Sequence, residues 1–398
     1  MNLKKKTNIL IVSHFAFKGS EKGVFFPLNI RNFLLDKIGI LIYIDHPFPQ
    51  SNFPASQITI YKQGVKTYQL TSPKVDFPIL FLFIYQFFLT IFFILRMPLR
   101  YDLAIACDNL SFISLYVLRR VRLIHKLIYY TVDYSPKRYT NPYLNSIYQH
   151  MDRLACRLSD TNWVTVKEMI TAKARNGLDI EKSAPFQIVP IGFNKEETRN
   201  TQKHSSSQNK KSRFNLFFVG VLYEKQGLQL VIEILPKIIK KFPHVKLTII
   251  GSGPFERQIK KLVTYLKLTK CVTYTGYITD HKKIVSVLTK NSGIGLAPYD
   301  PSIGDFTYYA DPSKIKLYLL CGLPVITTHV PPIAKIIKGK KAGFVINYSK
   351  EDLMNSLEEL MKNEKIFSLF RTNAIKLSHE YDDNRILERA FKNLPNSF

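Results

Sequence analysis

The sequence predicts an α/β protein built from two Rossmann-like domains. Short apolar, β-branched segments alternate with amphipathic stretches through nearly the whole chain, which is typical of βαβ units and parallel sheets. The length of 398 residues suits two domains, at roughly 100–200 residues each. A polar Ser/Lys/Gln-rich segment without periodicity, residues 194–213, separates the two halves. We expect this segment to be a flexible connection.

Each half contains six segments that we expect to be strands. In the first half they are residues 7–14, 40–47, 101–108, 126–133, 161–166 and 186–193. In the second half they are residues 214–221, 246–253, 272–278, 292–299, 323–330 and 342–347. Helices are expected between them, as at residues 227–242 and 255–268, where apolar side chains recur at helical spacing.

The domain boundaries follow from this pattern. We expect one domain at residues 1–193 and the other at 214–379. A final helix within residues 380–398 is expected to cross back onto the first domain. The two domains would then face each other across a cleft, with ligands at the carboxyl ends of the strands.

The chain is strongly basic, with 57 Lys and Arg against 30 Asp and Glu and a formal net charge of +27. Such a surface attracts phosphorylated substrates or anionic lipid, and a merely solvated Lys-rich surface is the alternative. No zinc-finger spacing or aromatic RNA-binding signature is present, so no nucleic-acid partner is expected. Four widely spaced cysteines and a short first apolar run indicate a cytoplasmic protein with reduced thiols.

Residues 77–95 form an apolar run interrupted only by Pro78, Gln86 and Thr90. As a helix it would be about 28 Å long, close to the roughly 30 Å of a bilayer core. We rank a buried core helix first, a helix lying in the membrane interface close behind, and a true span a distant third. The second choice implies a peripheral position on the inner face of the membrane.

The segment 311–328 has the features of a phosphate site at a helix start. Asp311 suits the N-cap and Pro312 the first turn. Ser313 and Lys314 then offer free backbone N–H groups and a cation at the positive end of the helix dipole. A well-capped αβ unit without a ligand is the alternative interpretation of the same residues.

Glycines and a lysine surround this segment at the ends of neighbouring strands. Gly220 ends the first strand of the second half, and Lys225 lies in the loop that follows. Gly251 and Gly253 end the next strand and resemble half of a dinucleotide fingerprint. The third glycine is absent and the strand is not the first of its domain, so NAD binding is not expected.

The ordered set VGVLYEKQG, IIGSGP, TGYI, SKIKLYLLCGLPVITT and AGFVIN resembles the donor domain of group 1, family 4 glycosyltransferases. The resemblance covers about residues 214–363 and implies the GT-B fold, with an acceptor-binding first domain. It also implies transfer of a sugar from a nucleotide-sugar with retention. No metal ion and no cofactor are implied beyond this co-substrate.

Residue roles carry over from the resemblance by position. Lys225 and Lys314 would hold the donor phosphates, with help from the N–H groups of Ser313 and Lys314. Tyr277 and Ile278 would border the base. The remaining residues expected in the donor site are Gly220, Gly251, Gly253, Asp311, Pro312 and Tyr318.

Two positions depart from the family pattern. Val221 stands where relatives have an arginine, and Leu317 stands where they have a glutamate that binds the ribose. Losing a hydrogen bond to a charged acceptor costs roughly 1.5–3 kcal/mol, so donor affinity would fall. Asp305 and Asp311 are candidate substitutes for the carboxylate, and Asp300 is a weaker one.

In the first half, Asp108 and Asp133 each follow an expected strand at its carboxyl end. Each is a candidate to position the acceptor hydroxyl or to take its proton, and a loop or N-cap aspartate is the alternative. Gly19 and Lys22, in the loop after His14, are candidates to contact donor phosphate or acceptor. His14 by itself is more often structural.

We therefore expect a metal-independent retaining glycosyltransferase for surface polysaccharide or glycolipid synthesis, acting on a glycan or lipid-linked acceptor. The alternative is a non-catalytic GT-B module that serves as a partner or scaffold in glycan assembly, which Leu317 and Val221 motivate. An epimerase acting on a nucleotide-sugar is a third, weaker alternative.

Overall fold

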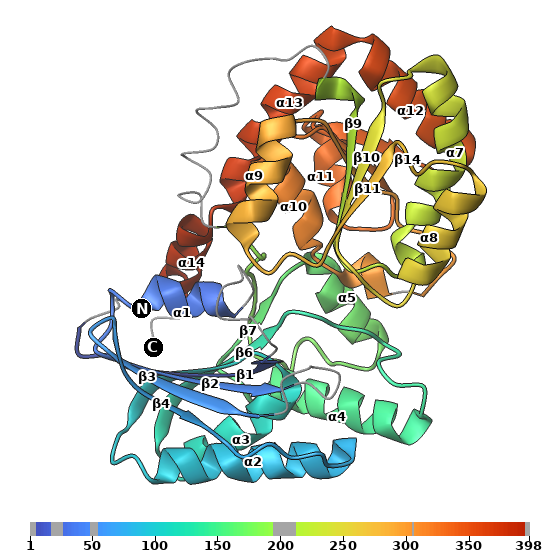
Figure 1. The fold of residues 1–398 in the computed structure, drawn as a ribbon. Coiled ribbons are helices and arrows are strands. Elements are labelled where there is room, and N and C mark those ends of the chain that lie inside the picture. Colours follow the sequence, from blue (N-terminus) through green and yellow to red (C-terminus); the bar gives the residue numbers. More distant parts are fainter. Residues whose placement is uncertain (1–4, 17–26, 48–54, 194–211, 305, 395–398) are drawn as a thin grey trace. The chain divides into compact units, whose positions relative to one another are not determined.

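The computed structural model describes residues 5–16, 27–47, 55–193, 212–304 and 306–394 (Figure 1). The chain forms two compact units. The first comprises Met1–Pro190 with Asn384–Phe398, and the second comprises Ile191–Asp383. The sequence placed these boundaries at residues 193 and 380. The expected connection, residues 194–213, lies almost wholly outside the described residues.

The first unit is built on an eight-stranded sheet in the order β4-β3-β2-β1-β5-β6-β7-β8. The strands β2, β1, β5, β6, β7 and β8 are parallel to one another. The six expected strands are all present. The strands are β1 Asn8–Ala16, β2 Ile40–Pro47, β3 Gln57–Lys62, β4 Val65–Thr71, β5 Tyr101–Ala106, β6 Ile124–Thr131, β7 Thr161–Val164 and β8 Phe186–Ile188.

The antiparallel strands β3 and β4 were missed by the sequence analysis. They form a hairpin whose two turn residues, Gln63 and Gly64, both have positive φ (47° and 82°). Two such residues are the requirement of a type I′ turn, which matches the twist of the strands. Alternating β-branched residues on both sides of the Gln-Gly pair were the available signal.

Helices cover both faces of this sheet, with α2 and α3 on one face and α1 and α14 on the other (Figure 1). The helices are α1 Leu28–Leu34, α2 Ile79–Leu95, α3 Asn109–Arg120, α4 Pro142–Leu158, α5 Lys167–Arg175 and α14 Asp383–Lys392. Phe391 of α14 packs edge-on against the fully buried Trp163 and stacks on Phe33. The last helix thus returns to the first unit, as the sequence predicted.

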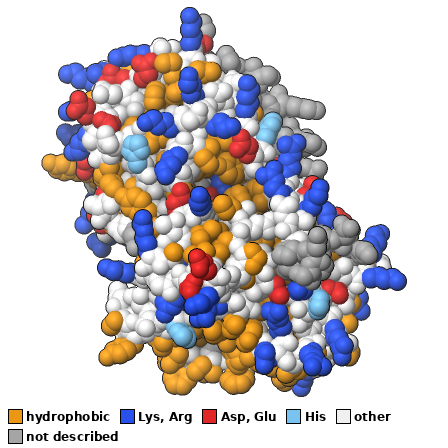
Figure 2. All heavy atoms as spheres, turned by 180° about the vertical axis from the view of Figure 1, so that it is seen from behind, with side chains coloured by type: hydrophobic (Ala, Val, Ile, Leu, Met, Phe, Trp, Pro, Cys, Tyr) orange, Lys and Arg blue, Asp and Glu red, His pale blue; other side chains and the backbone are white. Residues whose placement is uncertain are grey.

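Helix α2 corrects the ranking given to the apolar run at residues 77–95. A helix buried all round was ranked first, but α2 buries only one side, including Phe93 and Ile94. Its other side exposes Phe81 and Phe88, each 62% accessible. Figure 2 shows hydrophobic side chains gathered at the lower edge of the molecule, the side where α2 lies in Figure 1. Among the described residues, no helix is long and apolar enough to cross a membrane.

The second unit is built on a six-stranded parallel sheet in the order β11-β10-β9-β12-β13-β14. All six expected strands are present. They are β9 Asn215–Val219, β10 Lys246–Ile250, β11 Val272–Gly276, β12 Ile294–Ala297, β13 Val325–Thr328 and β14 Gly343–Ile346. Its helices are α7 Leu228–Lys241, α8 Glu256–Tyr265, α9 His281–Asn291, α10 Ser313–Leu320, α11 Ile333–Gly339, α12 Lys350–Lys362 and α13 Glu364–Ser378.

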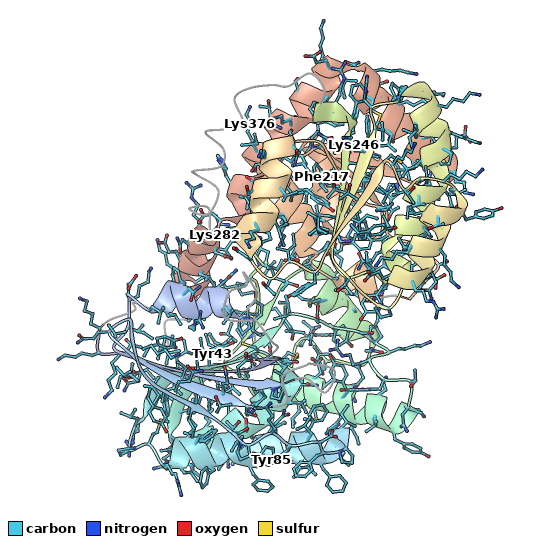
Figure 3. All side chains as sticks on the ribbon, in the orientation of Figure 1. Tyr43, Tyr85, Phe217, Lys246, Lys282 and Lys376 are labelled. Carbon is cyan, nitrogen blue, oxygen red and sulfur yellow. The ribbon has the colours of Figure 1, made fainter. Side chains whose placement is uncertain are left out.

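The apolar stripe expected on α7 faces the core, where Val231, Leu235 and Ile238 are fully buried with β-strand residues such as Leu247. Lys246, Lys282 and Lys376, which are labelled in Figure 3, are exposed lysines of this unit. These lysines place positive charge at the surface, while the carboxyl ends of the strands lead into the loops that follow.

Candidate donor and acceptor sites

Three loops meet at the carboxyl ends of β9, β10 and β11. The N–H of Gly220 donates to the carbonyl of Ile250 at 2.9 Å, and the N–H of Gly251 donates to the carbonyl of Gly276 at 2.9 Å. A further bond of 2.9 Å joins the N–H of Leu222 to the carbonyl of Ser252. The loops therefore form one backbone layer, and the predicted site residues Gly220, Gly251 and Gly253 all belong to it.

Close backbone packing accounts for two of these glycines. A Cβ on Gly251 would lie 2.0 Å from the carbonyl oxygen of Gly220, and one on Gly253 would lie 2.6 Å from backbone atoms of Leu222. Neither contact can be relieved by moving a flexible side chain. Gly251 and Gly253 are thus required for the loops to touch, and their contact with a donor stays a prediction.

Gly220 has a different neighbour. Its φ is +130°, and a Cβ there would lie 3.3 Å from Cε of Lys314 and 3.6 Å from its Nζ. The absence of a side chain at Gly220 therefore leaves room for the Lys314 side chain over the backbone at the end of β9. The sequence predicted that these two residues share one site, and the structure brings them together.

Lys314 is a buried cation in an aromatic setting. Its Nζ lies 4.0 Å from the ring centroid of Phe218 and 5.2 Å from that of Tyr299, and it donates to Oε1 of Gln226 at 2.5 Å. No ion pair joins it to a carboxylate within the described part of the chain. Burial lowers the pKa of Lys314 to about 7. An ammonium so placed gains from a bound anion.

The start of α10 differs from the prediction by one residue. Pro312 is the N-cap and Ser313 the first helical residue, and no side chain caps the helix. Ser313 is exposed, so its N–H is among those open at the positive end of the helix. The uncapped N-terminus next to Lys314 is suited to oxygen atoms of a phosphate.

Asp311 was predicted as the N-cap, which is wrong, and its predicted contact with the donor stays a prediction. Its Oδ2 accepts from the N–H of Ile191 at 2.8 Å and pairs with Nζ of Lys316 at 2.5 Å. Both side chains are buried, at 3% and 1% exposure. Lys316 also donates to the carbonyl of Ile191 at 2.5 Å. Asp311 therefore ties α10 to residue 191, where the chain enters this unit.

Other predicted donor residues line the same edge. Lys225 lies in a short 3₁₀ helix, Glu224–Gln226, and its carbonyl accepts from the N–H of Asp300 at 3.0 Å. Tyr277, directly after β11, is 53% exposed, and Ile278 beside it is half-buried. These positions agree with a ligand that runs along the loop ends, but base and phosphate contacts stay predictions.

In the first unit, Asp108 is the N-cap of α3, the alternative that the sequence left open. Its carboxylate accepts from the N–H and the hydroxyl of Ser111, each at 2.8 Å. It also bonds Nδ1 of His14, with both oxygens at 3.0 Å. Burial alone would raise the pKa of Asp108, but His14 and the bonds from Ser111 hold it below its ordinary value. A carboxylate so occupied is a poor base, so we correct that candidate role.

His14 is the residue that the sequence analysis undervalued. It lies on β1 beside β5, and Asp108 follows β5, so the two residues meet at one sheet edge. No described residue forms a hydrogen bond with its Nε2. The ring lies 5.0 Å from that of His46, which burial and then His14 keep neutral by lowering its pKa well below the ordinary range. A histidine ending one strand and an aspartate ending its neighbour was the available signal.

Asp133, the other acidic candidate, follows β6 at the same edge of the sheet and is exposed. Its part in catalysis stays a prediction. Gly19 and Lys22 lie outside the described residues, as does Asp305. Among the described residues, no group of three or more His, Cys, Asp or Glu side chains is placed to hold a metal ion.

Comparison with known proteins identifies the second unit. Residues 213–363 match the family model of the group 1 glycosyl transferases. The second unit belongs to this family. In the Saccharomyces cerevisiae phosphatidylinositol N-acetylglucosaminyltransferase GPI3 subunit, 244 residues align at 22% identity, covering 61% of this chain and 49% of that protein. The Streptococcus pneumoniae alpha-monoglucosyldiacylglycerol synthase aligns at 23% identity over 182 residues, or 43% and 39% of the two chains.

Solved structures establish the fold of the whole chain. Anabaena Alr3699/HepE in complex with UDP superposes with a TM-score of 0.64 at 15% identity, covering 98% of this chain and 99% of that one. Sucrose-phosphate synthase from Thermosynechococcus elongatus gives a TM-score of 0.71 at 14% identity, covering 97% and 99%. Both are GT-B proteins, and this chain has the GT-B fold. By sequence, the chain spans about half the length of the curated relatives it matches.

Within this glycosyltransferase domain, the two departures from the family differ in position. Leu317 is buried, with 4% exposure, and no ribose can reach its side chain. Val221 is 49% exposed next to Gly220. Tyr318 was predicted to contact the donor, but it is fully buried. Its hydroxyl accepts from the N–H of Val219 at 2.8 Å and donates to the carbonyl of Leu296 at 3.2 Å, so it joins β9 to β12.

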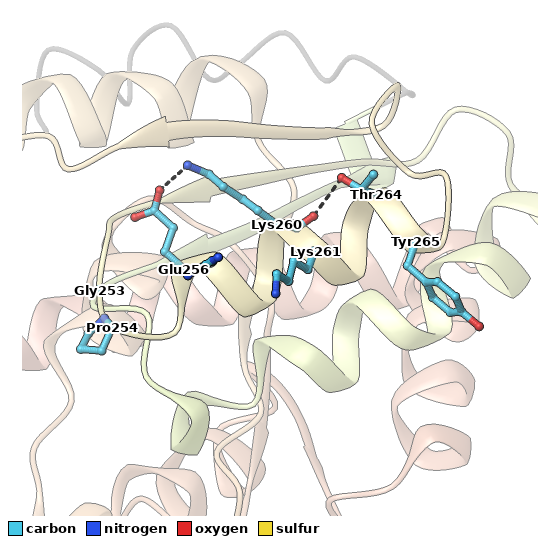
Figure 4. Close-up of a pocket in the computed structure, with 8 residues that line it drawn as sticks. Gly253, Pro254, Glu256, Lys260, Lys261, Thr264 and Tyr265 are labelled. Carbon is cyan, nitrogen blue, oxygen red and sulfur yellow. Dashed lines mark hydrogen bonds and ion pairs between the residues drawn. The ribbon is translucent and has the colours of Figure 1, made fainter.

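A second basic surface lies along α8 of the glycosyltransferase domain. It is an open hollow of about 860 Å³ beside Gly253, lined by Arg257, Lys260 and Lys261 (Figure 4). Lys260 already pairs with Glu256 at 2.5 Å. These lysines and the arginine stand on an exposed helix, whereas Lys314 is buried at a strand end. The hollow is a rival anion site, and its exposure makes it the weaker one.

Proposed function

We propose that this chain is a retaining glycosyltransferase that moves a sugar from a nucleotide-sugar to a glycan or lipid-linked acceptor. The observation that carries the proposal is Lys314, a buried cation with no carboxylate partner among the described side chains. It stands at the open N-terminus of α10, beside the glycine layer at the ends of β9 to β11. Membership of the second unit in the group 1 glycosyltransferases supports the same donor class.

Loss of a diphosphate leaves negative charge that the site must stabilise. The ammonium group of Lys314 would neutralise the charge of the departing diphosphate. The N–H groups of Ser313 and Lys314 would donate hydrogen bonds to the phosphate oxygens. Because the helix backbone fixes these N–H groups before the donor arrives, they favour the departing diphosphate without reorganisation. We assign no metal to this step. Retention is part of the proposal and is tested by the anomeric configuration of the product.

The acceptor class is proposed from the relatives and from charge. The names of relatives contain phosphatidylinositol, pyrophosphoryl-undecaprenol and monoglucosyldiacylglycerol, all of them lipids. Another is named for colanic acid biosynthesis. A net charge of +27 and the exposed apolar side of α2 suit a site on the cytoplasmic face of an anionic membrane. We propose a role there in making a glycolipid or a surface polysaccharide.

A second candidate is a non-catalytic GT-B module within a glycan-assembly complex. Leu317 and Val221 favour it, because two side chains that hold the donor in relatives are apolar here. This candidate predicts no turnover and weak or absent binding of nucleoside diphosphates.

A donor screen distinguishes the two candidates. The full chain is incubated with UDP-, GDP- and other nucleotide-sugars and an anionic membrane extract, and release of nucleoside diphosphate and labelled lipid are measured. The proposal expects turnover with one donor, lost in Lys314→Met and kept in Lys376→Met, which changes an exposed lysine. Absence of turnover and of binding with every donor would reject the proposal and leave the scaffold.

A further inference from the structure

The first unit contains an apolar pocket of about 330 Å³ between α2, α3 and α4. Its walls are mainly aromatic and aliphatic, with Phe83 and Phe87 from α2, Ile113 from α3, and Leu144 and Met151 from α4. This volume is within the range of ligand pockets in proteins, and such walls suit a hydrocarbon chain. None of the donor-site residues belongs to it, because it lies wholly within the first unit.

The pocket opens on an exposed apolar surface. Leu80, Ile84 and Phe88 of α2 and Ile147 of α4 line it and are also 46–62% exposed. They therefore form the mouth. The outer side of α2 continues the same surface with Phe81, Phe92 and Leu95, at 62%, 48% and 61% exposure. A soluble surface seldom leaves so many large apolar side chains of one helix in water.

Cations flank this surface. Arg96 and Arg100 follow the C-terminal end of α2 and are exposed, and Arg120 and Arg122 are exposed at the end of α3, which packs against α2. Apolar side chains between cations match the interface of an anionic bilayer, where Lys and Arg near the surface are attracted to the lipid headgroups. The mouth of the pocket would then face the acyl region.

Polar groups lie at the other end of the pocket. His14 and His46 line it, together with Gln86 and Thr90. Nε2 of His46 bonds Oγ1 of Thr90 at 2.7 Å. Gln86 is only 1% exposed, and while its Nε2 donates to the carbonyl of Pro47, its Oε1 has no partner among the described residues. An unmatched buried acceptor in a pocket calls for a donor from a ligand.

We propose that this pocket binds the hydrocarbon chain of a membrane lipid that enters from the bilayer past Leu80, Ile84 and Phe88. The hydroxyl-bearing head of the lipid lies toward Gln86 and His14. The chain is that of the acceptor, which rests on the proposed function. In this arrangement the same helix anchors the protein and forms one wall of the acceptor site.

The test separates the pocket from the outer surface of α2. The probe is cis-parinaric acid, a fluorescent chain, displaced by 1-dodecanol. Ile113→Trp fills the pocket, and Leu144→Trp does so independently from α4. Each is expected to weaken chain binding by about tenfold or more, because excluding two methylene groups already costs that much. Vesicle binding should stay unchanged in both variants.

The matched variant Phe81→Ser/Phe92→Ser changes only the outer side of α2, because neither residue lines the pocket. It should weaken sedimentation with phosphatidylglycerol vesicles and leave displacement by 1-dodecanol unchanged. Far-ultraviolet circular dichroism confirms that each variant is folded. Failure of the native chain to bind the probe, or equal probe binding in native and both pocket-filled variants, would overturn the proposal.

Chain binding is measured without a donor, so it does not depend on transferase activity. Binding of the probe with no turnover on any donor would retain the lipid pocket and reject the proposed function. Turnover on a lipid acceptor with a KM unaffected by either pocket-filling variant would retain the function and reject the pocket.

Discussion

Lys314 is only 8% exposed, and no described carboxylate pairs with its ammonium group. Its ammonium group is held by two aromatic rings and one amide oxygen, which stabilise a cation less than an anion does. With a pKa of about 7, Lys314 in the empty site is mainly neutral only above about pH 7, and a bound diphosphate favours its charged form. Donor binding and proton uptake are therefore coupled at this residue.

The pH dependence of nucleoside diphosphate binding follows from this coupling. With a pKa of about 7, about nine-tenths of Lys314 is neutral at pH 8 before binding. A bound diphosphate favours the charged form, so we expect uptake approaching one proton at pH 8 and weakening affinity as pH rises above about 7. Calorimetry in buffers of different ionisation enthalpy measures the uptake. Lys314→Met should abolish it, and no uptake in the native chain would refute the coupling.

His14 and Asp108 make a separate prediction for the first unit. Asp108→Asn keeps an N-cap for α3, so we expect the free energy of unfolding to change by less than about 1 kcal/mol. It removes the negative charge beside His14, and turnover should fall about tenfold or more. Steady-state kinetics measures this loss, and native turnover in the variant would make the pair purely structural.

The neighbourhood of Lys314 was predictable only in part. Parallel strands bring their carboxyl ends to one edge, so Gly220 and Lys314 were expected together. The rings of Phe218 and Tyr299 and the amide of Gln226 come from separate loops and strands, and no spacing in the sequence reports their approach. Asp311 was wrongly expected at the N-cap because its partners, Lys316 and Ile191, meet only in the fold.

At the scale of elements, α10 serves several purposes with successive residues. Lys314 faces the end of β9, Lys316 holds the segment at Ile191, and Leu317 and Tyr318 are core residues. The segment at Phe193 also pairs with Asp382 in a parallel bridge, so both ends of this unit's chain lie together. The helix thus connects the donor site to the place where the chain enters and leaves the unit.

The buried ion pair of α10 should dominate the stability of this region. Lys316→Met leaves the carboxylate of Asp311 buried without its cation, which typically costs roughly 3–5 kcal/mol. Lys340→Met breaks an exposed pair with Glu380 and should cost at most about 1 kcal/mol. Denaturant unfolding of both variants measures the difference. Equal losses in the free energy of unfolding would show that the buried pair stabilises the unit no more than the exposed pair does.

Introducing the family's glutamate at Leu317 and its arginine at Val221 should have opposite effects on stability and UDP binding. Leu317→Glu buries an unpaired carboxylate and should destabilise the unit by roughly 3 kcal/mol or more, so it cannot recover ribose binding. Val221→Arg places a cation on an exposed position beside Gly220. We expect it to tighten UDP binding by about tenfold at little cost in stability. Thermal unfolding and calorimetry decide, and a stable Leu317→Glu variant with tighter binding would contradict this placement.

Strands with a clear apolar pattern in the sequence were predictable, whereas the burial of an element that depends on tertiary packing was not. All twelve expected strands exist because runs of β-branched residues ended at loops. For α2, composition could not decide between a buried and an interfacial helix, because apolar side chains occur on every side of it. Its burial is set by α3 and the sheet, which cover one side only.

At the scale of the whole molecule, the two units have separate cores and separate proposed roles, acceptor binding in the first and donor binding in the second. The second carries the group 1 glycosyltransferase domain and its candidate diphosphate site. The first carries a polar pair at a sheet edge and an apolar pocket that opens beside α2. Ordered motifs predicted the donor domain from sequence. The pocket of the first unit could not be foreseen, because its lining residues come from three helices and two strands and lie far apart in the chain.

The central claim is that the donor diphosphate binds at Gly220, Ser313 and Lys314. A crystal structure of the full chain with UDP tests it most directly. We expect the diphosphate within hydrogen-bonding distance, about 3 Å, of the Lys314 ammonium and of the N–H groups that open α10. Tyr277 should border the base, and a residue other than Leu317 should meet the ribose. A diphosphate on Arg257, Lys260 and Lys261 along α8, or none in the second unit, would contradict it.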